Sequence, residues 1–370
     1  MKRRSPDYTL LVVTFLLILS GLAILTSASS VVAYENFNNT SYYLIHQLIY
    51  GVVAGLALGA IVYKINYQNW KKLGIFSLIL AVILLILVFL PSTSLSHGGA
   101  RRWLEIPIPL LGSFSFQSAE FAKLAFILYL AAWFEKRGQE VKSFKGGFIP
   151  FAFLLIVVSI LLMAQPDMGT LIVIVSSSAV VYFLAGAMIK HLAIAFTGGA
   201  CFLAVAIYLA PYRIGRLLVF LNPDFDPQGI GYQISQALLA IGSGGIFGRG
   251  FGYSRQKFNY LPESMGDSVF AIIGEEFGFI GAVLIISLFL LYAWRGFRIA
   301  QKAPDTFGML LAGGITSMVI LQAIINIAAI SALVPLTGIP LPFISYGGSS
   351  MIIFIIATAI LLNISRNTKN

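Results

Sequence analysis

Apolar residues occur in long runs along the whole chain, and short polar segments separate these runs. A run of roughly twenty apolar residues is long enough to cross the hydrocarbon core of a bilayer as a helix. The pattern predicts an all-α polytopic membrane protein with about ten transmembrane helices, which form one integral membrane domain over residues 1–370. The expected spans cover about residues 10–31, 44–63, 73–90, 118–134, 148–164, 168–187, 190–209, 268–294, 307–333 and 343–364.

Two of the polar segments between the expected spans are much longer than the rest, and they cover about residues 91–117 and 210–267. Loops of this length are usually functional. The second contains a turn-forming stretch at 222–231, and residues 232–241 then have the spacing of a short amphipathic helix. Residues 242–252 follow, with six glycines in eleven positions. This density suits either a flexible re-entrant turn or a backbone that approaches an anion closely.

The distribution of charge predicts how the chain is oriented. Hydrophobic residues make up 58% of the 370 residues and charged residues only 10%, and the mean hydropathy is +0.90. With ten spans, sixteen of the 24 lysines and arginines fall on the side that holds both termini, and seven fall on the other side. This bias predicts that both termini are cytoplasmic. The net charge of +10 therefore reflects topology and anionic lipid, and it predicts no nucleic acid partner.

The number and spacing of the cysteines and histidines exclude a disulfide and the common zinc sites. The single cysteine, Cys201, excludes a disulfide within the chain and any cysteine-rich metal site. The three histidines are scattered and have no zinc-ligand spacing.

The first polar segment carries candidate phosphate ligands. Arg101 and Arg102 stand together on the predicted outer side, and arginine forks match phosphate oxygens, although a solvated surface pair is the alternative. Gln117 then leads into a helix on which Glu120 and Lys123 share one face. Lys123 falls one to two turns inside the membrane, where a charge needs a partner or a water-filled cavity. The Glu120–Lys123 pair therefore either contacts substrate or is a purely structural ion pair.

The second polar segment combines cations with two carboxylates, and its candidate residues are Arg249, Arg255, Lys257, Glu263 and Asp267. Carboxylates kept at a membrane boundary are functional candidates by default. The alternative for Asp267 is that it caps the helix that begins at Ser268. Glu275 and Glu276 lie about two turns deeper, and we interpret both as structural.

Two further segments interrupt the apolar pattern. Asp167 lies between two spans, where it is either an N-cap or a pairing site at a helix end. Residues 335–350 contain three prolines and three glycines, so the helix must break there. A break in a helix at a membrane boundary is tolerated where protein covers the backbone or where a water-filled cavity lies beside it. We therefore expect this segment to line a cavity that opens to the outer face.

Several motifs follow one another along nearly the whole chain: Gly-Ala-Arg-Arg-Trp103, Gln117-Ser-Ala-Glu-Phe-Ala-Lys123, Gln165-Pro-Asp-Met-Gly-Thr170, Ala240-Ile-Gly-Ser-Gly-Gly245, Ser254-Arg-Gln-Lys257, Tyr260-Leu-Pro-Glu263 and Pro342-Phe-Ile-Ser-Tyr-Gly-Gly-Ser-Ser350. Together they resemble the SEDS (shape, elongation, division and sporulation) family, and the branch that includes FtsW more than the branch that includes RodA. Two departures occur, at 117–120, where the family usually has Gln-Pro-Ser-Glu, and at 263–267, where Glu-Ala-His-Thr-Asp is common. Both acids of the second motif are present.

The resemblance implies a peptidoglycan glycosyltransferase that polymerises lipid II on the outer face of the bacterial cytoplasmic membrane. The donor's diphosphate is already a good leaving group, so one carboxylate base suffices, and Asp267 is implied in that role. Arg102 and Lys123 would hold the diphosphate, and the other substrate-binding candidates are Arg101, Glu120, Gln117, Arg249, Arg255, Lys257 and Glu263. A divalent cation (Mg²⁺ or Mn²⁺) would share the charge, with Glu263 binding it or orienting substrate, and no organic cofactor is expected.

The implied partners are a class B penicillin-binding transpeptidase and other membrane proteins of the division or elongation machinery. The rival function is a lipid II flippase, which needs a polar path to the cytoplasmic face. The unusual charges gather instead on the predicted outer side, which favours an enzyme. A scaffold that only positions a transpeptidase ranks last, since it would leave the carboxylates and cations without a role.

Overall fold

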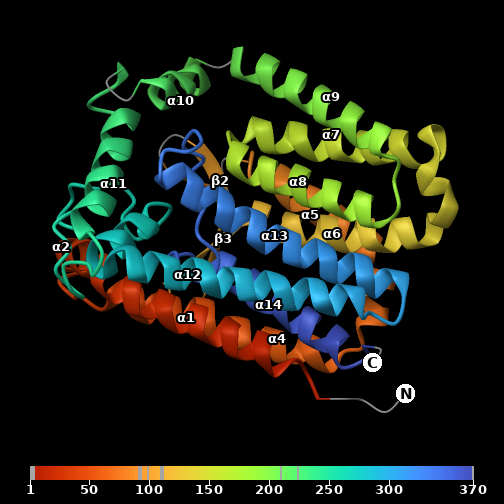
Figure 1. Cartoon of the computed structure of the whole chain (residues 1–370), viewed down its shortest axis with the longest axis horizontal. Coiled ribbons are helices and arrows are strands. Elements are labelled where there is room, and N and C mark those ends of the chain that lie inside the picture. Colours follow the sequence, from red (N-terminus) through yellow and green to blue (C-terminus); the bar gives the residue numbers. More distant parts are fainter. Residues whose placement is uncertain are drawn as a thin grey trace.

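The computed structural model describes residues 5–90, 94–97, 100–108, 112–208, 211–222 and 225–368. Long helices lie side by side with their axes roughly parallel, and both ends of the chain lie at the same end of this bundle (Figure 1). The opposite end carries α2 (Ser30–Phe37), α10 (Pro211–Leu221), α11 (Ile230–Gly244) and the strands β2 (Ala100–Ile108) and β3 (Gly112–Gln117) (Figure 1). The segments that the sequence places on the outer side therefore gather at one end of the molecule.

The N-terminal part of the bundle is built from helices joined by short turns. Its elements are α1 (Tyr8–Ala28), α2 (Ser30–Phe37), α3 (Tyr42–His46), the π-helical η1 (Gln47–Val53), α4 (Ala54–Lys64) and α5 (Tyr67–Leu87). After the sheet come α6 (Ser118–Arg137), η2 (Gly138–Lys142), η3 (Phe144–Phe148), α7 (Ile149–Ala164), α8 (Met168–Leu184) and α9 (Ile189–Tyr208).

The C-terminal part contains two shorter helices and then three long ones. Its elements are α10 (Pro211–Leu221), α11 (Ile230–Gly244), α12 (Val269–Gln301), α13 (Thr306–Ile330) and α14 (Gly348–Ser365). The short helix expected at 232–241 is confirmed as α11, and it is a turn longer than its apolar spacing indicated.

The prediction of a polytopic membrane protein is confirmed. Among the described residues, seven segments are long and apolar enough to span a bilayer: α1, the continuous helix Tyr42–Lys64, α5, the helix Phe144–Ala164, α12, α13 and α14. The other three expected spans correspond to α6, α8 and α9. The helix α6 carries internal charge, and α8 and the apolar part of α9 are shorter. The total of ten crossings stays a prediction.

The first long polar segment, which was expected to be a loop, contains three strands that form an antiparallel sheet in the order β1-β2-β3. The strands are β1 (Ser94–His97), β2 (Ala100–Ile108) and β3 (Gly112–Gln117). Polar and apolar residues alternate from Ser113 to Gln117, which is the period of a strand. Trp103 pairs with Gln117, so the sheet ends where α6 begins.

Helices α13 and α14 form the interior of the bundle. About three quarters of each helix's most apolar window is buried, 72% in α13 and 78% in α14, whereas only 22% is buried in α5. Polar side chains on α13 therefore lie inside the protein. They need protein partners there, because an unsatisfied polar group in an apolar interior is costly.

The glycine-rich segment packs against a break in α12. Gly278 has φ +66°, and the amide of Phe279 donates to the carbonyl of Gly245 at 2.9 Å. In the same way, the amide of Arg249 donates to the carbonyl of Glu275 at 2.9 Å. A Cβ on Gly278 would lie 2.3 Å from the nitrogen of Gly248, so this approach of backbone to backbone requires glycine.

Candidate functional site

Asp267 lies in the loop immediately before α12, with its side chain half-buried. Its Oδ1 accepts a hydrogen bond from Nε2 of Gln233 on α11 at 3.3 Å and from Oγ of Ser268 at 3.4 Å. The capping interpretation of Asp267 is wrong. The N-cap of α12 is Ser268, which makes no side-chain capping bond, and Asp267 faces α11 instead. Its carboxylate is therefore not engaged with the helix's own backbone.

The position of Asp267 is set by the buried side chain of Asn326 on α13. Nδ2 of Asn326 donates to the backbone carbonyl of Asp267 and to that of Ile339, each at 2.8 Å. Three segments distant in sequence thus meet at one amide. Hydrogen bonds from a fully buried donor to two carbonyls resist displacement, because breaking them leaves polar groups unsatisfied.

Glu120 and Lys123 form a buried ion pair on α6. Nζ of Lys123 lies 2.9 Å from Oε2 of Glu120, and each side chain is 1% exposed. The same ammonium donates to Oε1 of Gln322 on α13 and lies 5.1 Å from the centre of the Phe354 ring. The sequence-based requirement that Lys123 have a partner is therefore met inside the protein.

Two amides on α13 connect the ion pair to Asp267. Gln322 and Asn326 are one turn apart, so they project from the same face of the helix. Nε2 of Gln322 donates to the carbonyl of Pro340 at 2.9 Å, and Asn326 donates to the adjacent carbonyl of Ile339. The segment between α13 and α14 is thereby fixed between Lys123 and Asp267.

Sequence reasoning missed three residues of this arrangement: Gln233, Gln322 and Asn326. A signal was available for the last two, because amides inside an apolar membrane helix are rare and mark polar interiors. Gln233 gave no such signal, because it stands in an amphipathic segment where a polar residue is expected.

The electrostatic environment of Asp267 raises the pKa of its carboxyl group to about 7. Desolvation is the largest cause, and the negative charge of Glu263 adds to it. The hydrogen bond from Ser268 and the positive charge of Arg216 act in the opposite direction. Arg216 on α10 is thus a further charged neighbour of the carboxylate. Its Nη1 also donates to the carbonyl of Leu336 at 3.1 Å.

Glu263 is exposed and has φ +51°, a left-handed conformation that is uncommon for a residue with a side chain. Its carbonyl accepts hydrogen bonds from the amides of Gly266 at 2.9 Å and Ser268 at 3.2 Å. The loop therefore closes on itself between the two acids, which brings their charges within mutual influence.

The first polar segment reaches the turn between α7 and α8. Nε of Arg102 donates to the carbonyl of Gln165 at 3.2 Å, and Nη2 donates to that of Pro166 at 2.5 Å. In the next turn Asp167 accepts from the amide of Thr170 at 3.1 Å, which confirms the N-cap interpretation. The side chain of Arg101 lies outside the described residues. Gln117 contributes its backbone amide, which donates to Oγ of Ser349 on α14 at 3.3 Å.

Lys257 belongs to a second group, centred on Glu276 near the break in α12. Its Nζ donates to the carbonyl of Gly252 at 2.6 Å and to Oγ of Ser27 at 3.0 Å. It also lies 3.7 Å from Oε1 of Glu276, which accepts from the hydroxyl of Ser27 at 2.5 Å. Lys257 is buried in this setting, so its charge already has internal partners.

Glu275 contacts the other residues of the second group. Its carboxylate accepts from Oγ of Ser254 at 2.6 Å and from the amide of Arg255 at 3.0 Å. Nη1 of Arg249 lies 3.8 Å from Oε1 of Glu275, and the side chain of Arg255 is exposed. In the described part of the chain no ion pair joins this group to Asp267 or Glu263. The structure therefore separates Arg249 and Lys257 from Asp267 and Glu263, with which the sequence analysis grouped them.

Asp267 with its neighbours forms the candidate active site. A half-buried carboxyl with a pKa near neutrality can accept a proton, and the positive charge of Arg216 acts on it. Within the ranges that the structure describes, no group of three or more His, Cys, Asp or Glu side chains is placed to hold a metal ion. This loop supplies two carboxylates, those of Glu263 and Asp267, which is fewer than such a group needs.

Comparison with known proteins relates this arrangement to one group. Residues 8–370 match the model of the FtsW, RodA and SpoVE family, described as "Cell cycle protein". The chain is 41% identical to stage V sporulation protein E of Bacillus subtilis (strain 168), over 100% of this chain and 99% of that one. It is 39% identical to the probable peptidoglycan glycosyltransferase FtsW of Trichlorobacter lovleyi, over 98% of this chain and 94% of that one.

Solved structures resemble the whole chain. One is described as "Structural coordination of polymerization and crosslinking by a peptidoglycan synthase complex". It has 27% identity and a TM-score of 0.79, and the match covers 98% of each chain. Another is the rod shape determining protein RodA of Thermus thermophilus. It has 26% identity and a TM-score of 0.70, and the match covers 99% of this chain and 98% of that one.

Proposed function

The chain belongs to the FtsW, RodA and SpoVE family of cell cycle proteins, and from this premise we infer that it is a peptidoglycan glycosyltransferase. The rival flippase function is not favoured, because the similar proteins are named for glycosyl transfer and a solved neighbour concerns polymerization. The substrate is lipid II, a disaccharide-peptide on a polyprenyl diphosphate, and the product is a glycan strand.

The observation that carries the mechanism is the environment of Asp267. Its carboxyl group has a pKa of about 7, so a large share is ionised at neutral pH and it binds a proton readily. The acceptor hydroxyl attacks the anomeric carbon of the donor and gives its proton to Asp267. The new bond joins that oxygen to the anomeric carbon, while the bond from this carbon to the phosphate oxygen breaks. Its electron pair leaves with the polyprenyl diphosphate, and inversion at carbon gives a β-linkage.

The leaving diphosphate needs positive charge, which Arg102 and Lys123 supply in this proposal. A guanidinium has five N–H donors, and two of those on Arg102 are occupied by the carbonyls of Gln165 and Pro166. Among the described residues no other partner of this guanidinium is found, so its remaining donors can meet phosphate oxygens. Glu120 and Gln322 engage two of the three donors of the Lys123 ammonium, and because this side chain is buried it would act on the diphosphate through its charge. Arg216 adds a third cation on the side of Asp267.

A divalent cation fits this site only together with substrate. Magnesium is often bound by one or two carboxylates plus substrate phosphates, and Glu263 is the exposed carboxylate available for that role. Such a cation would neutralise charge on the leaving diphosphate. Activity measured with EDTA, and then with added Mg²⁺ or Mn²⁺, tests this part of the proposal.

The same proposal places the reaction on the outer face of the cytoplasmic membrane. The support is that Asp267 directly precedes α12, which begins at the end of the bundle away from both termini (Figure 1), and the basic residues assign the termini to the cytoplasm. We further propose a membrane-anchored penicillin-binding transpeptidase as partner. A solved structure similar to this chain concerns a complex that coordinates polymerization with crosslinking.

The test uses purified protein in detergent with lipid II, alone and with the candidate transpeptidase, and resolves glycan strands on a gel. The wild type makes strands, whereas Asp267→Asn makes none, because an amide cannot accept the proton. The matched control is Asp305→Asn, which changes a carboxylate that caps α13 at the opposite end of the bundle. Near-normal synthesis by a folded Asp267→Asn variant would refute the assignment of the base.

A further inference from the structure

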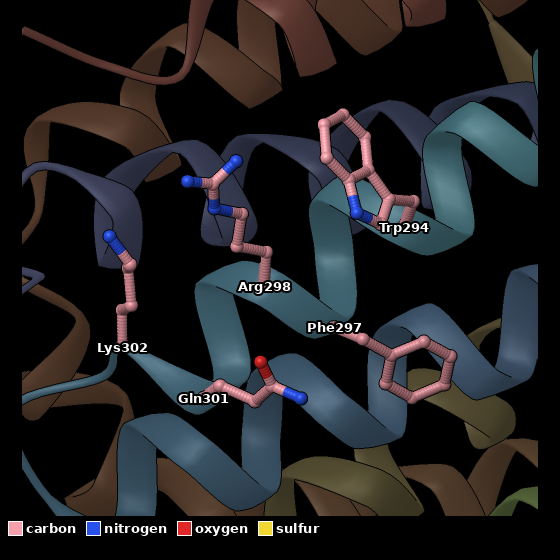
Figure 2. A pocket seen from close by; sticks show the side chains of 5 residues that line it. All are labelled: Trp294, Phe297, Arg298, Gln301 and Lys302. Carbon is pink, nitrogen blue, oxygen red and sulfur yellow. The ribbon is translucent and has the colours of Figure 1, made fainter.

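A surface hollow of about 420 Å³ lies at the C-terminal end of α12. Its lining residues all come from the last turns of that helix and its C-cap: Trp294, Phe297, Arg298, Gln301 and Lys302. Figure 2 shows these five side chains around the hollow. Roughly thirty residues of helix separate it from Asp267, which corresponds to a distance on the order of 45 Å. The hollow is therefore not part of the candidate active site.

Three of the lining residues form one stripe. Trp294, Arg298 and Lys302 are spaced four residues apart, so they lie above one another on one face of the helix. Figure 2 shows their side chains rising from the ribbon in the same direction. The guanidinium of Arg298 lies 5.6 Å from the centre of the Trp294 ring. The opposite face of these turns, which includes Ile299 and Ala300, is buried in the bundle, so the stripe faces outward.

The two cations of the stripe lack acidic partners within the described ranges. The six ion pairs found there include neither Arg298 nor Lys302. The nearby Arg295 differs, because its Nη2 lies 2.5 Å from Oδ2 of Asp7. One cation of this helix end is thus neutralised internally, while two are left facing the same hollow together with the amide of Gln301.

The hollow stands where a membrane-spanning helix leaves the bilayer. α12 is apolar enough to span, and its last seven residues continue beyond the expected span that ends at 294. Tryptophan is enriched at the level of lipid headgroups, and lysine and arginine just beyond it meet the anionic lipids of the cytoplasmic leaflet. The basic residues of the chain assign this end to that leaflet.

We propose that this hollow binds the headgroup of an anionic phospholipid, such as phosphatidylglycerol. Arg298 and Lys302 contact the phosphate, Gln301 supplies an amide for the polar headgroup, and the rings of Trp294 and Phe297 lie against the first part of the acyl chains. A guanidinium can engage two phosphate oxygens at once, which makes the site selective for phosphate over a diffuse negative surface.

The competing interpretation is that Arg298 and Lys302 only orient the chain in the membrane, as topogenic charge does. The chain offers a matched control for this. Lys142 and Lys145 are exposed on the same predicted side, and the described ion pairs include neither. The variants R298Q/K302Q and K142Q/K145Q remove the same charge, but only the first changes the hollow.

The test is native mass spectrometry of the full chain released from mixed phosphatidylglycerol and phosphatidylcholine micelles. We expect R298Q/K302Q to retain about tenfold less phosphatidylglycerol than the wild type, while K142Q/K145Q retains it as the wild type does. Equal loss in both double variants, or no loss in R298Q/K302Q, would overturn the proposal. Full displacement of the lipid by millimolar inorganic phosphate would overturn the lipid as ligand, because a free anion would then suffice.

A second measurement leaves the site intact in case R298Q/K302Q does not fold. In a chain with Trp70, Trp103 and Trp133 replaced by phenylalanine, Trp294 is the one remaining tryptophan. Brominated phosphatidylglycerol should quench its fluorescence more strongly than brominated phosphatidylcholine does at equal mole fraction. Equal quenching by the two lipids would show that the site has no preference for the anionic headgroup, and the proposal would fail. Neither experiment depends on glycosyl transfer.

Discussion

The side-chain amide of Asn326 donates a hydrogen bond to the backbone carbonyl of Asp267 across 2.8 Å, from a position inside the bundle. The same nitrogen donates to Ile339, so it joins the loop before α12 to the segment before α14. The carboxylate of Asp267 is thereby held by a residue that touches neither it nor any substrate. We regard Asn326 as a positioning residue.

Asn326→Leu removes both donated bonds and leaves two buried carbonyls unsatisfied, at a cost on the order of 1–3 kcal/mol each. We expect polymerisation of lipid II to fall at least tenfold. The matched control is Asn363→Leu, because Asn363 also donates to two carbonyls, those of Tyr63 and Ile65, at the other end of the bundle. Both variants should lower Tm, but only Asn326→Leu should lower turnover per folded molecule. Equal losses of turnover would assign Asn326 a role in folding alone.

Glu263→Gln should shift the pH dependence of turnover. The base must be ionised, so turnover in the wild type should rise through the pKa of Asp267, near pH 7. The negative charge of Glu263 raises that pKa, and its removal therefore moves the rise to lower pH. The measurement is turnover of lipid II between pH 5 and 9 at saturating substrate. An unchanged midpoint would mean that the two carboxylates do not interact in the working enzyme.

Asp267→Asn should stabilise the fold above pH 7. The pKa of Asp267 is raised in the folded state, so the folded protein binds this proton more tightly than the unfolded chain does. Folding stability therefore declines as pH rises from about 4, the ordinary aspartate value, to about 7, and is level above that. The side-chain amide of the variant does not titrate, so the folding stability of the variant shows no such decline. The difference in Tm between variant and wild type should grow across that window, and a constant difference would contradict the raised pKa.

Lys123→Met should destabilise the protein strongly, because it leaves the buried carboxylate of Glu120 without its partner. Breaking one side of a buried pair typically costs about 3–5 kcal/mol. The double variant Glu120→Gln/Lys123→Met removes both charges and should recover most of the lost Tm. If the recovered protein cannot polymerise lipid II, Lys123 contributes to substrate binding. Full activity of the double variant would mark the pair as structural.

Cysteine labelling tests the sidedness of the site. In a chain with Cys201→Ser, a cysteine in place of Met265 or the exposed Tyr253 should react with a membrane-impermeant thiol reagent in intact cells. A cysteine in place of the exposed Gln139 should react only after the cells are opened. The reverse pattern would place Asp267 on the cytoplasmic side and would contradict transfer at the outer face.

Much of this protein's structure follows from local sequence. Apolar runs determine spanning helices whatever their neighbours are, because an unpaired backbone cannot enter lipid. Asp267 and Glu263 could be singled out because charge is costly near a membrane, and that cost depends on the residues themselves. The N-cap at Asp167 was also predictable, since a cap acts within three residues.

Contacts between distant segments decided the rest. Lys123 and Gln322 are 199 residues apart, and Asp267 and Asn326 are 59 apart. No periodicity relates such positions, so only the packing of α6 and α13 shows that two amides connect the ion pair to the carboxylate. Likewise, Lys257 looked like a substrate ligand until the fold placed it against Glu276 and Ser27. A charge has the same appearance in a sequence whether its partner is substrate or protein, because that partner is chosen by the tertiary structure.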